Sequence, residues 1–219
     1  MNHFFKITLL SLALLLSSTQ SSLALLQSSK ITPTQENKSY EPSPAEKFRA
    51  DSRKLWTQHM VWDHECLVSV NNREPAHTEA ITKRLMKNQE DIGAALGHYY
   101  GKAAGDKITH LLKEHIKIGN EVAKATKAHN VSARTNFVKE WYGNGNIIAS
   151  TLSELTGVSK ATLKSHWDTH LKLADRDLDT QIKQQWTKNI STVDKALEMG
   201  LMLADILAQA TITKFNNKF

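Results

Sequence analysis

Residues 55–62 read Leu-Trp-Thr-Gln-His-Met-Val-Trp, and their central histidine has a tryptophan three positions away on each side. The same pattern, with apolar residues flanking a histidine, returns in residues 112–118 and 167–173, centred on His115 and His170. Spacings of three and four residues are typical of one face of an α-helix. The steps between the histidines are 115 − 59 = 56 and 170 − 115 = 55 residues, about two helices with their connections. We therefore predict three copies of one helical hairpin, each carrying a histidine at the same height.

Turn signals divide the chain after residue 43 into segments of helical length. In Ser43-Pro44-Ala45-Glu46 a serine N-cap, a proline and a glutamate form a capping box, which predicts a helix start. Further breaks are predicted at 71–75, 101–105, 129–130, 156–159 and, without glycine or proline, 188–191. No segment alternates polar and apolar residues with strand-like composition. The predicted fold is an all-α, up-down bundle of about six helices built from three helical hairpin repeats.

The first 43 residues differ in composition from the rest of the chain. Lys6 precedes the apolar run 7–16, and Ser22-Leu23-Ala24 offers a small-residue cleavage site, so residues 1–24 are predicted to be a secretory signal peptide. Residues 25–43 are rich in Ser, Thr, Pro and Asn and are predicted to be a flexible linker, leaving 44–219 as a single helical-bundle domain. We expect an exported protein, periplasmic or secreted. After signal cleavage we expect no integral membrane segment.

Charge, cysteine content and motifs narrow the functional classes. The formal net charge is +6, but the lysines are scattered along nearly every predicted helix, and no nucleic-acid-binding motif accompanies them. We therefore expect a solvated basic surface and no nucleic-acid partner. The lone Cys66 cannot form an internal disulfide. The Gly-x-Ser-x-Gly, phosphate-loop, dinucleotide-loop and His-Glu-x2-His patterns are all absent, which argues against a hydrolytic enzyme.

A polar position opposes each inward histidine. Antiparallel helices bring two residues to the same height when both are equally distant from the connecting turn. The pairs 59/88, 115/144 and 170/205 have midpoints at 73.5, 129.5 and 187.5, each at or beside a predicted break. Asp205-Ile206 also aligns with Asp91-Ile92. The predicted polar layer at mid-bundle comprises His59, Asn88, Asp91, His115, Asn144, His170 and Asp205.

Two interpretations of this layer remain open from the sequence. One is a structural network in which imidazoles donate to Asn or Asp and fix the helix register. The other is a transition-metal site for zinc, iron, copper or nickel. Its proposed ligands are His59, His115, His170 and Asp205, with Asp91 as a further carboxylate. The corresponding functions are an exported binding or interaction protein of unknown ligand and, alternatively, a metal-binding or metal-dependent protein. A secreted host-interacting factor is a third hypothesis.

Several motifs resemble those of a family of small bacterial all-helical proteins, mostly exported. The resemblance covers about residues 50–219 and rests on Leu55-Trp56-x2-His59-x2-Trp62, Asn88-Gln89-x-Asp91-Ile92-Gly93, Tyr99-Tyr100-Gly101-x2-Ala104-Gly105, Leu111-Leu112-x-Glu114-His115-Ile116, Trp141-Tyr142-x-Asn144, His170-Leu171, Ala204-Asp205 and Lys218-Phe219. It implies the helical fold and offers no mechanism. The chain departs from the family pattern at Asp63-His64, where Thr-Arg is usual, and at Ile147, where an acidic residue is usual. The second departure leaves the middle repeat without its carboxylate.

Overall fold

The computed structural model describes residues 40–219, so the predicted signal peptide and the linker as far as residue 39 lie outside the described residues. Six α-helices and a closing 3-10 turn make up the described chain. They are α2 (Pro44–Asn72), α3 (Pro75–Tyr100), α4 (Lys102–Lys127), α5 (Val131–Thr156), α6 (Lys160–Ile182), α7 (Trp186–Lys214) and η1 (Asn216–Lys218). The predicted all-α class and helix number are confirmed.

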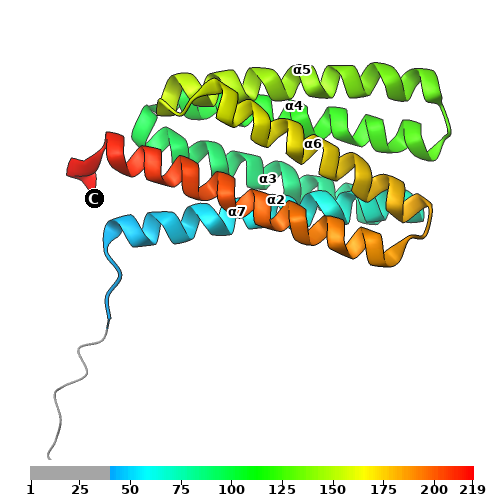
Figure 1. The fold of residues 1–219 in the computed structure, drawn as a ribbon, viewed down its shortest axis with the longest axis horizontal. Helices are drawn as coiled ribbons and strands as arrows, with labels where there is room; N and C mark the ends of the chain where they lie inside the picture. The colour runs from blue at the N-terminus through cyan, green and yellow to red at the C-terminus, as the bar shows by residue number, and fades with distance from the viewer. Residues whose placement is uncertain (1–39) are drawn as a thin grey trace, which may run out of the picture. The chain divides into compact units, whose positions relative to one another are not determined.

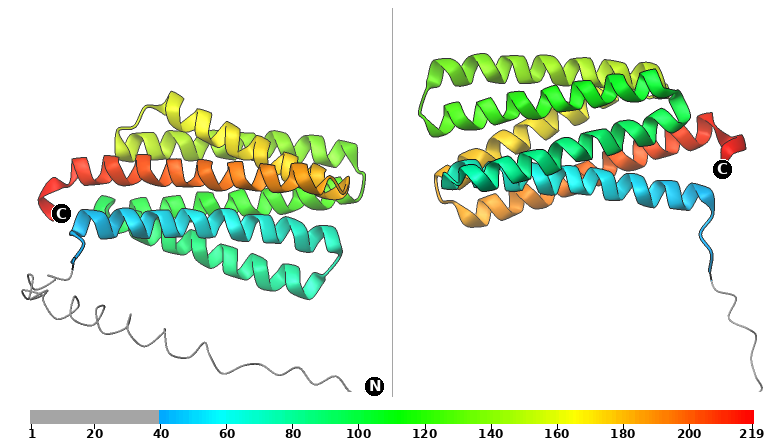
Figure 2. Two further views of the ribbon diagram at one scale, coloured as in Figure 1. Left: turned by 60° about the horizontal axis from the view of Figure 1, so that its bottom comes forward. Right: turned by 180° about the vertical axis from the view of Figure 1, so that it is seen from behind.

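Successive helices run antiparallel and lie side by side, which gives an up-down bundle (Figure 1). The last helix, α7, returns to the first and packs along α2, and α2 also contacts α4 and α6 (Figure 2). Helix α2 is therefore central to the bundle. Helices α6 and α7 are close together near their connection and diverge toward the N-terminal end of α6 in both figures.

The helix boundaries follow the local sequence signals with one exception. Ser43 and Glu46 form the predicted capping box, because the Ser43 hydroxyl accepts from the Glu46 N–H and the Glu46 carboxylate accepts from the Ser43 N–H. The exception is the last connection, which was predicted at 188–191 and lies at residues 183–185. Gln184 there takes a left-handed conformation, with φ of 55°. This turn contains no glycine or proline, so the composition of the sequence does not mark it. The predicted connection therefore lies several residues after the observed one.

All six helices contribute to the largest hydrophobic cluster, which lies in the half of the bundle nearer the α3–α4 and α5–α6 connections. Its members include Trp56, Ile92, Leu112, Ile148, Trp167 and Leu203, each almost fully removed from solvent. Burial of side chains of this size contributes about 1.5–3 kcal/mol each relative to exposure. The His-centred motifs therefore lie in or beside the main core.

Helix α7 is, among the described residues, long and apolar enough to cross a membrane by length and composition alone. The sequence prediction that no further run reaches that length therefore needs correction. In the bundle, the apolar residues Met199, Leu203, Leu207 and Ala208 of α7 are buried, and the helix contacts α2 and α6. A core helix of a bundle passes the same test of length and composition, so the segment by itself is weak evidence for a membrane span.

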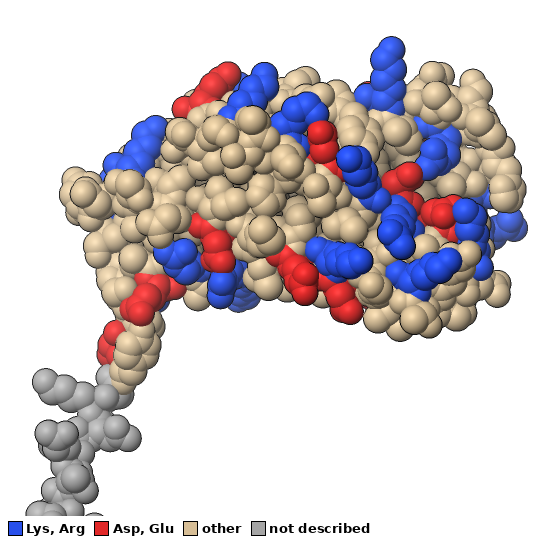
Figure 3. Space-filling view, viewed as in Figure 1, with Lys and Arg blue, Asp and Glu red and all other residues tan. Residues whose placement is uncertain are grey.

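Charged side chains of both signs are interspersed over the face seen in Figure 3. Many of them form ion pairs between neighbouring turns of one helix, such as Lys102–Asp106 and Lys164–Asp168. Exposed pairs of this kind contribute little to stability, about 0.3–0.5 kcal/mol each.

Candidate functional site

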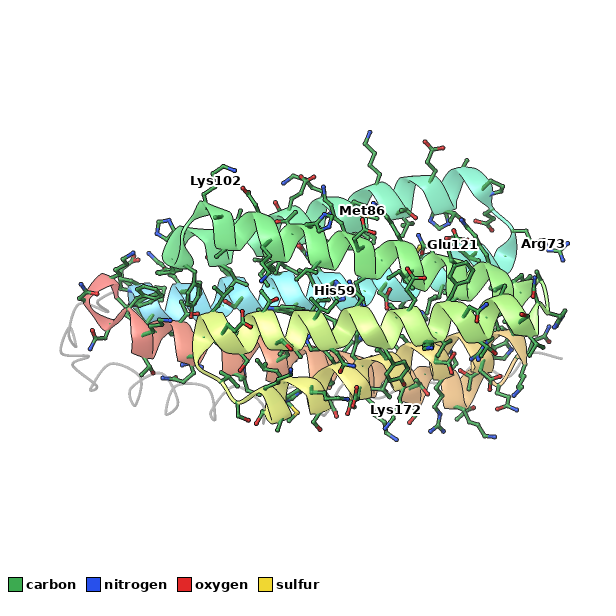
Figure 4. All side chains as sticks on the ribbon, turned by 90° about the horizontal axis from the view of Figure 1, so that it is seen from above. His59, Arg73, Met86, Lys102, Glu121 and Lys172 are labelled. Carbon is green, nitrogen blue, oxygen red and sulfur yellow. The ribbon has the colours of Figure 1, made fainter. Side chains whose placement is uncertain are left out.

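The three histidines at the centre of the repeated motif meet inside the bundle. His170 lies between the other two, with its ring centroid 5.6 Å from that of His59 and 5.6 Å from that of His115. The three side chains are 0%, 1% and 4% exposed for His59, His115 and His170, respectively. His59 lies near the middle of the bundle's length, far from the Arg73 end (Figure 4). Three segments that are distant in sequence therefore contribute to one imidazole cluster.

Two asparagines hold the backbone beside this cluster in the same way. Asn88 Nδ2 donates to the Leu55 carbonyl over 3.0 Å, and Asn144 Nδ2 donates to the Leu111 carbonyl over 3.2 Å. Each carbonyl lies four residues before a histidine of the cluster. Asn144 Oδ1 also accepts from His115 Nδ1 over 2.8 Å, which fixes the tautomer of that ring and leaves Nε2 without a proton.

Several nitrogen atoms of the cluster have no hydrogen-bond partner. Both ring nitrogens of His59, Nε2 of His115 and Nε2 of His170 are buried and unpaired, and so is Oε1 of the adjoining Gln89. A buried polar atom without a partner costs about 1–3 kcal/mol. This concentration of unpaired atoms at one level of the core is the most unusual feature of the predicted layer.

Burial keeps the three imidazoles neutral. It lowers the pKa of His59 to about 4, and the Gln89 side chain only partly opposes this effect. Burial also lowers the pKa of His115 to about 3, against the opposing influence of Asn144. The pKa of His170 is held well below its usual range by burial and then by the neighbouring imidazoles of His115 and His59. At neutral pH the layer is therefore uncharged.

Tryptophan rings surround the imidazoles. The Trp167 ring stands edge-on to His115, with centroids 5.0 Å apart, and Trp141 lies 5.3 Å from the same histidine. Gly119 makes room for Trp141, because a Cβ at this position would come within 3.0 Å of the indole. These two tryptophans are core fillers that enclose the layer.

The two aspartates of the predicted layer lie elsewhere. Asp91 pairs with Lys87 on the outside of α3, and Asp205 accepts two hydrogen bonds from the Arg53 guanidinium on the outside of α2 and α7. The displaced last connection explains Asp205: a turn centred on residue 184 places residue 198, not 205, opposite His170. Seven residues correspond to about 10 Å along a helix. The sequence predicts that both carboxylates lie beside the histidines, and the structure instead places them on the outside of the helices.

Within residues 40–219, no three His, Cys, Asp or Glu side chains are arranged so that they could hold a metal ion. The candidate ligands His59, His115 and His170 are close together, but Asp205 is already bound to arginine. The arrangement therefore fits a neutral layer that orders the helices better than it fits a preformed metal centre.

A second polar cluster, which the sequence interpretation missed, lies beside His170. His64 of α2 and Asp177 of α6 are joined through Nδ1 and Oδ2 over 2.7 Å, and Asp177 is buried. Asp63, His64, His170 and Asp177 line a cavity of about 20 Å³ between α2, α6 and α7. The available signal was an acidic residue seven positions after His170, which is two turns along the same helical face.

A larger groove runs between α6 and α7 where the two helices diverge. Its volume is about 810 Å³, and residues 161–173 of α6 and 195–202 of α7 form its walls. Leu173, Met199 and Met202 supply apolar surface, and Met202 is 58% exposed. Leu173 also lines the small polar cavity behind the groove.

Another groove, of about 700 Å³, lies near the connection between α2 and α3. Its lining includes Arg73, Glu74, Glu79, Lys83 and Lys124. Five charged side chains line this second groove, whereas two, Lys195 and Glu198, line the α6–α7 groove.

The chain was compared with protein-family models, with curated proteins and with solved structures, and no match was found in any of the three comparisons. The functional argument therefore rests on the chain's own geometry.

Proposed function

We propose that this chain is an exported helical-bundle binding protein that takes a small amphipathic molecule into the groove between α6 and α7. The observation that carries the proposal is the volume of about 810 Å³, which lies within the usual range of about 300–1,000 Å³ for small-molecule sites. The buried imidazole layer then serves as the rigid support of α6 rather than as the site itself.

The chemistry of the groove defines the kind of ligand. Apolar side chains of both helices would cover a hydrophobic body, while Thr162, Ser165 and Thr169 place hydroxyl groups along the α6 side. On the α7 side, Lys195 and Glu198 form no ion pair with any residue in 40–219. Such a site favours a molecule with one apolar part and a polar group that hydrogen-bonds at the rim.

The repeat hypothesis belongs to the same proposal, because it explains why this groove occurs at the third hairpin. The asparagine-to-carbonyl bond occurs in the first two hairpins, at Asn88 and Asn144. By the 29-residue separation, the position that matches Asn88 and Asn144 is 170 + 29 = 199, and Met199 there has no amide to repeat the bond. The next residue, Gly200, packs against Met60, since a Cβ there would come 2.8 Å from Met60 Cγ. The third hairpin therefore lacks the polar tie of the other two.

Binding of the fluorescent apolar anion anilinonaphthalenesulfonate to the folded protein tests the groove. Thr169→Trp would place an indole in the α6–α7 groove, and Thr78→Trp would do the same in the α2–α3 groove. The two threonines are matched, because each lies on a helix and its hydroxyl donates to the carbonyl four residues earlier, although Thr169 is exposed and Thr78 is half-buried.

We expect Thr169→Trp to weaken dye binding at least tenfold and Thr78→Trp to leave it unchanged, with the near-ultraviolet circular dichroism of both variants preserved. No saturable binding by the wild type, or equal binding by wild type and Thr169→Trp, would overturn the proposal. Stoichiometric cobalt or zinc binding that is lost in a folded His59→Ala variant would instead favour the metal-binding alternative. No feature of residues 40–219 supports the third hypothesis, a host-interacting role.

A further inference from the structure

The cavity between α2, α6 and α7 brings together titratable groups from distant parts of the chain. Asp63 and His64 come from α2, and His170 and Asp177 come from α6. The wall contributed by α7 is apolar and consists of Val193, Ala196 and Leu197. At about 20 Å³ the cavity has room for about one water molecule, so it suits a proton or a water and no larger ligand.

Hydrogen bonds fix the Asp177 side of this cavity. Oδ2 of Asp177 is bonded to His64 Nδ1, while Oδ1 accepts from Gln181 Nε2 over 2.8 Å and from Asn189 Nδ2 over 2.5 Å. Three donors on one buried carboxyl group stabilise its charged form. Asp177 therefore links α2, α6 and α7 through these hydrogen bonds.

Asp63 faces the same cavity without such donors. Within residues 40–219, the hydrogen bonds at this cavity go to Asp177, and none reaches the Asp63 carboxyl group. A negative charge on Asp63 would therefore have no donor to stabilise it. His170 also lines the cavity, is 4% exposed, and has no hydrogen-bond partner in residues 40–219. The Asp63 side chain is partly exposed, so a proton or a water bound between its carboxyl group and the buried His170 ring can exchange with solvent.

We infer that this cavity is a proton-binding site, in which the Asp63 carboxyl group is held neutral beside Asp177 and exchanges its proton with solvent. When Asp63 loses its proton, the cavity is faced by two carboxylates, Asp63 and Asp177, and by one imidazolium, His64. The net charge of the three groups is then −1, and the α7 wall of the cavity supplies no cation to balance it. The site thus makes the contact of α2 with α6 and α7 sensitive to pH.

The charges around Asp63 agree with this assignment. Burial, followed by the negative charge of Asp177, raises the pKa of Asp63 to about 7, and His64 only partly opposes the rise. Burial lowers the pKa of His64, but its bond to Asp177 and the charges of Asp177, Glu65 and Asp63 together raise it above the usual value. Both groups therefore hold protons at a pH where an exposed aspartate has lost its own.

The direction of the linked stability change follows from the raised pKa of Asp63. The folded state binds this proton more tightly than the unfolded state, whose ordinary value is 3.8. The stabilising effect is complete below that value and is lost as the pH rises through about 7. Through this site, unfolding should therefore become easier as the pH rises from about 4 to about 7, with no further change above that.

Carbon-13 NMR of aspartate carboxyl groups in the full chain, from pH 4 to 9, tests the inference directly. We expect one carboxyl resonance to titrate near pH 7 and to be missing from Asp63→Asn, which imitates the neutral form. His64→Gln should raise that midpoint because a nearby positive charge is removed. Asp205→Asn, at an arginine-paired carboxylate on the outside, is the matched control and should leave the resonance unchanged.

Thermal unfolding gives a second measurement that needs no assignment. The melting temperature of Asp63→Asn minus that of the wild type should rise as the pH goes from about 4 to about 7, because only the wild type loses the contribution of the Asp63 proton. The same difference for Asp205→Asn should stay constant over this range. If every aspartate titrates below pH 5, or if the resonance near pH 7 persists in Asp63→Asn, the assignment of a proton site to Asp63 is wrong.

Discussion

Asn144 is the residue that ties the imidazole layer most directly to the backbone. Its amide donates to the Leu111 carbonyl and accepts from His115. Asn144→Ala leaves both groups unpaired in the core, so we expect the free energy of unfolding to fall by about 1–3 kcal/mol in urea denaturation at pH 7.5.

Asn136 supplies the control for this prediction, because it lies on the same helix and is exposed. Asn136→Ala should change the unfolding free energy by less than about 0.5 kcal/mol. A change of less than about 0.5 kcal/mol in Asn144→Ala as well would show that its two hydrogen bonds do not stabilise the fold.

At the scale of single residues, the sequence identified the inward histidines because helical periodicity alone determines which face a residue occupies. The spacing of 29 residues also identified Asn144 as the partner of His115. It could not identify the partners of Asp91 and Asp205, because each forms an ion pair on the outside. Long, flexible lysine and arginine side chains reach carboxylates at several positions, and no short motif records which one they choose.

The contact between α3 and α4 depends on glycines at which the two helices approach closely. A Cβ at Gly105 would come 2.5 Å from the Gly93 carbonyl oxygen and 2.8 Å from Gly97 Cα. Both neighbours are backbone atoms, so the helices would have to move apart. We expect Gly105→Ala to lower the free energy of unfolding by about 1–3 kcal/mol.

Gly143 in the middle of α5 gives the opposite expectation, because nothing lies within 4 Å of a Cβ built there. Gly143→Ala should raise the free energy of unfolding by roughly 0.5–1 kcal/mol through helix propensity. Both variants can be compared by urea denaturation under one condition. If Gly143→Ala also lowers the free energy of unfolding, the expectation that a side chain is tolerated at Gly143 is wrong.

At the scale of helices, boundaries marked by capping residues, glycine or proline could be predicted within a few residues. The connection at 183–185 could not, because its left-handed Gln184 is a residue type that usually avoids this conformation. That single displacement also moved the partner of His170 from residue 198 to 205. An error of one turn at a connection thus became an error in the composition of the site.

The bundle as a whole combines a neutral imidazole layer with a second polar cluster beside it. Local periodicity predicts the layer, since its members lie at fixed distances from the turns. The cluster of Asp63, His64 and Asp177 depends on how α6 crosses α2, which is a long-range contact between segments with 113 residues from His64 to Asp177. The groove has the same origin, because its walls come from α6 and α7 together and depend on how these two helices pack. Contacts of this kind are not encoded in a local pattern.

The imidazole layer predicts acid sensitivity of the whole fold. The folded state keeps His59 and His115 neutral, with pKa values of about 4 and about 3, whereas the unfolded state protonates them at 6.5. Their stabilising contribution is therefore present above pH 6.5 and is lost as the pH falls through these folded-state values. For His59 alone, a difference of 6.5 − 4 corresponds to roughly 3 kcal/mol.

Urea denaturation at pH 7.5, 6 and 5 should show this loss, and His115→Gln should reduce its slope because glutamine does not titrate. His110→Gln is the matched control, since His110 is on the same helix and exposed. Its slope should equal that of the wild type. The loss toward acid opposes the loss toward alkali expected from Asp63, so the wild type should be most stable between about pH 6 and 7. An optimum that stays in place in His115→Gln would show that other groups control the acid limb.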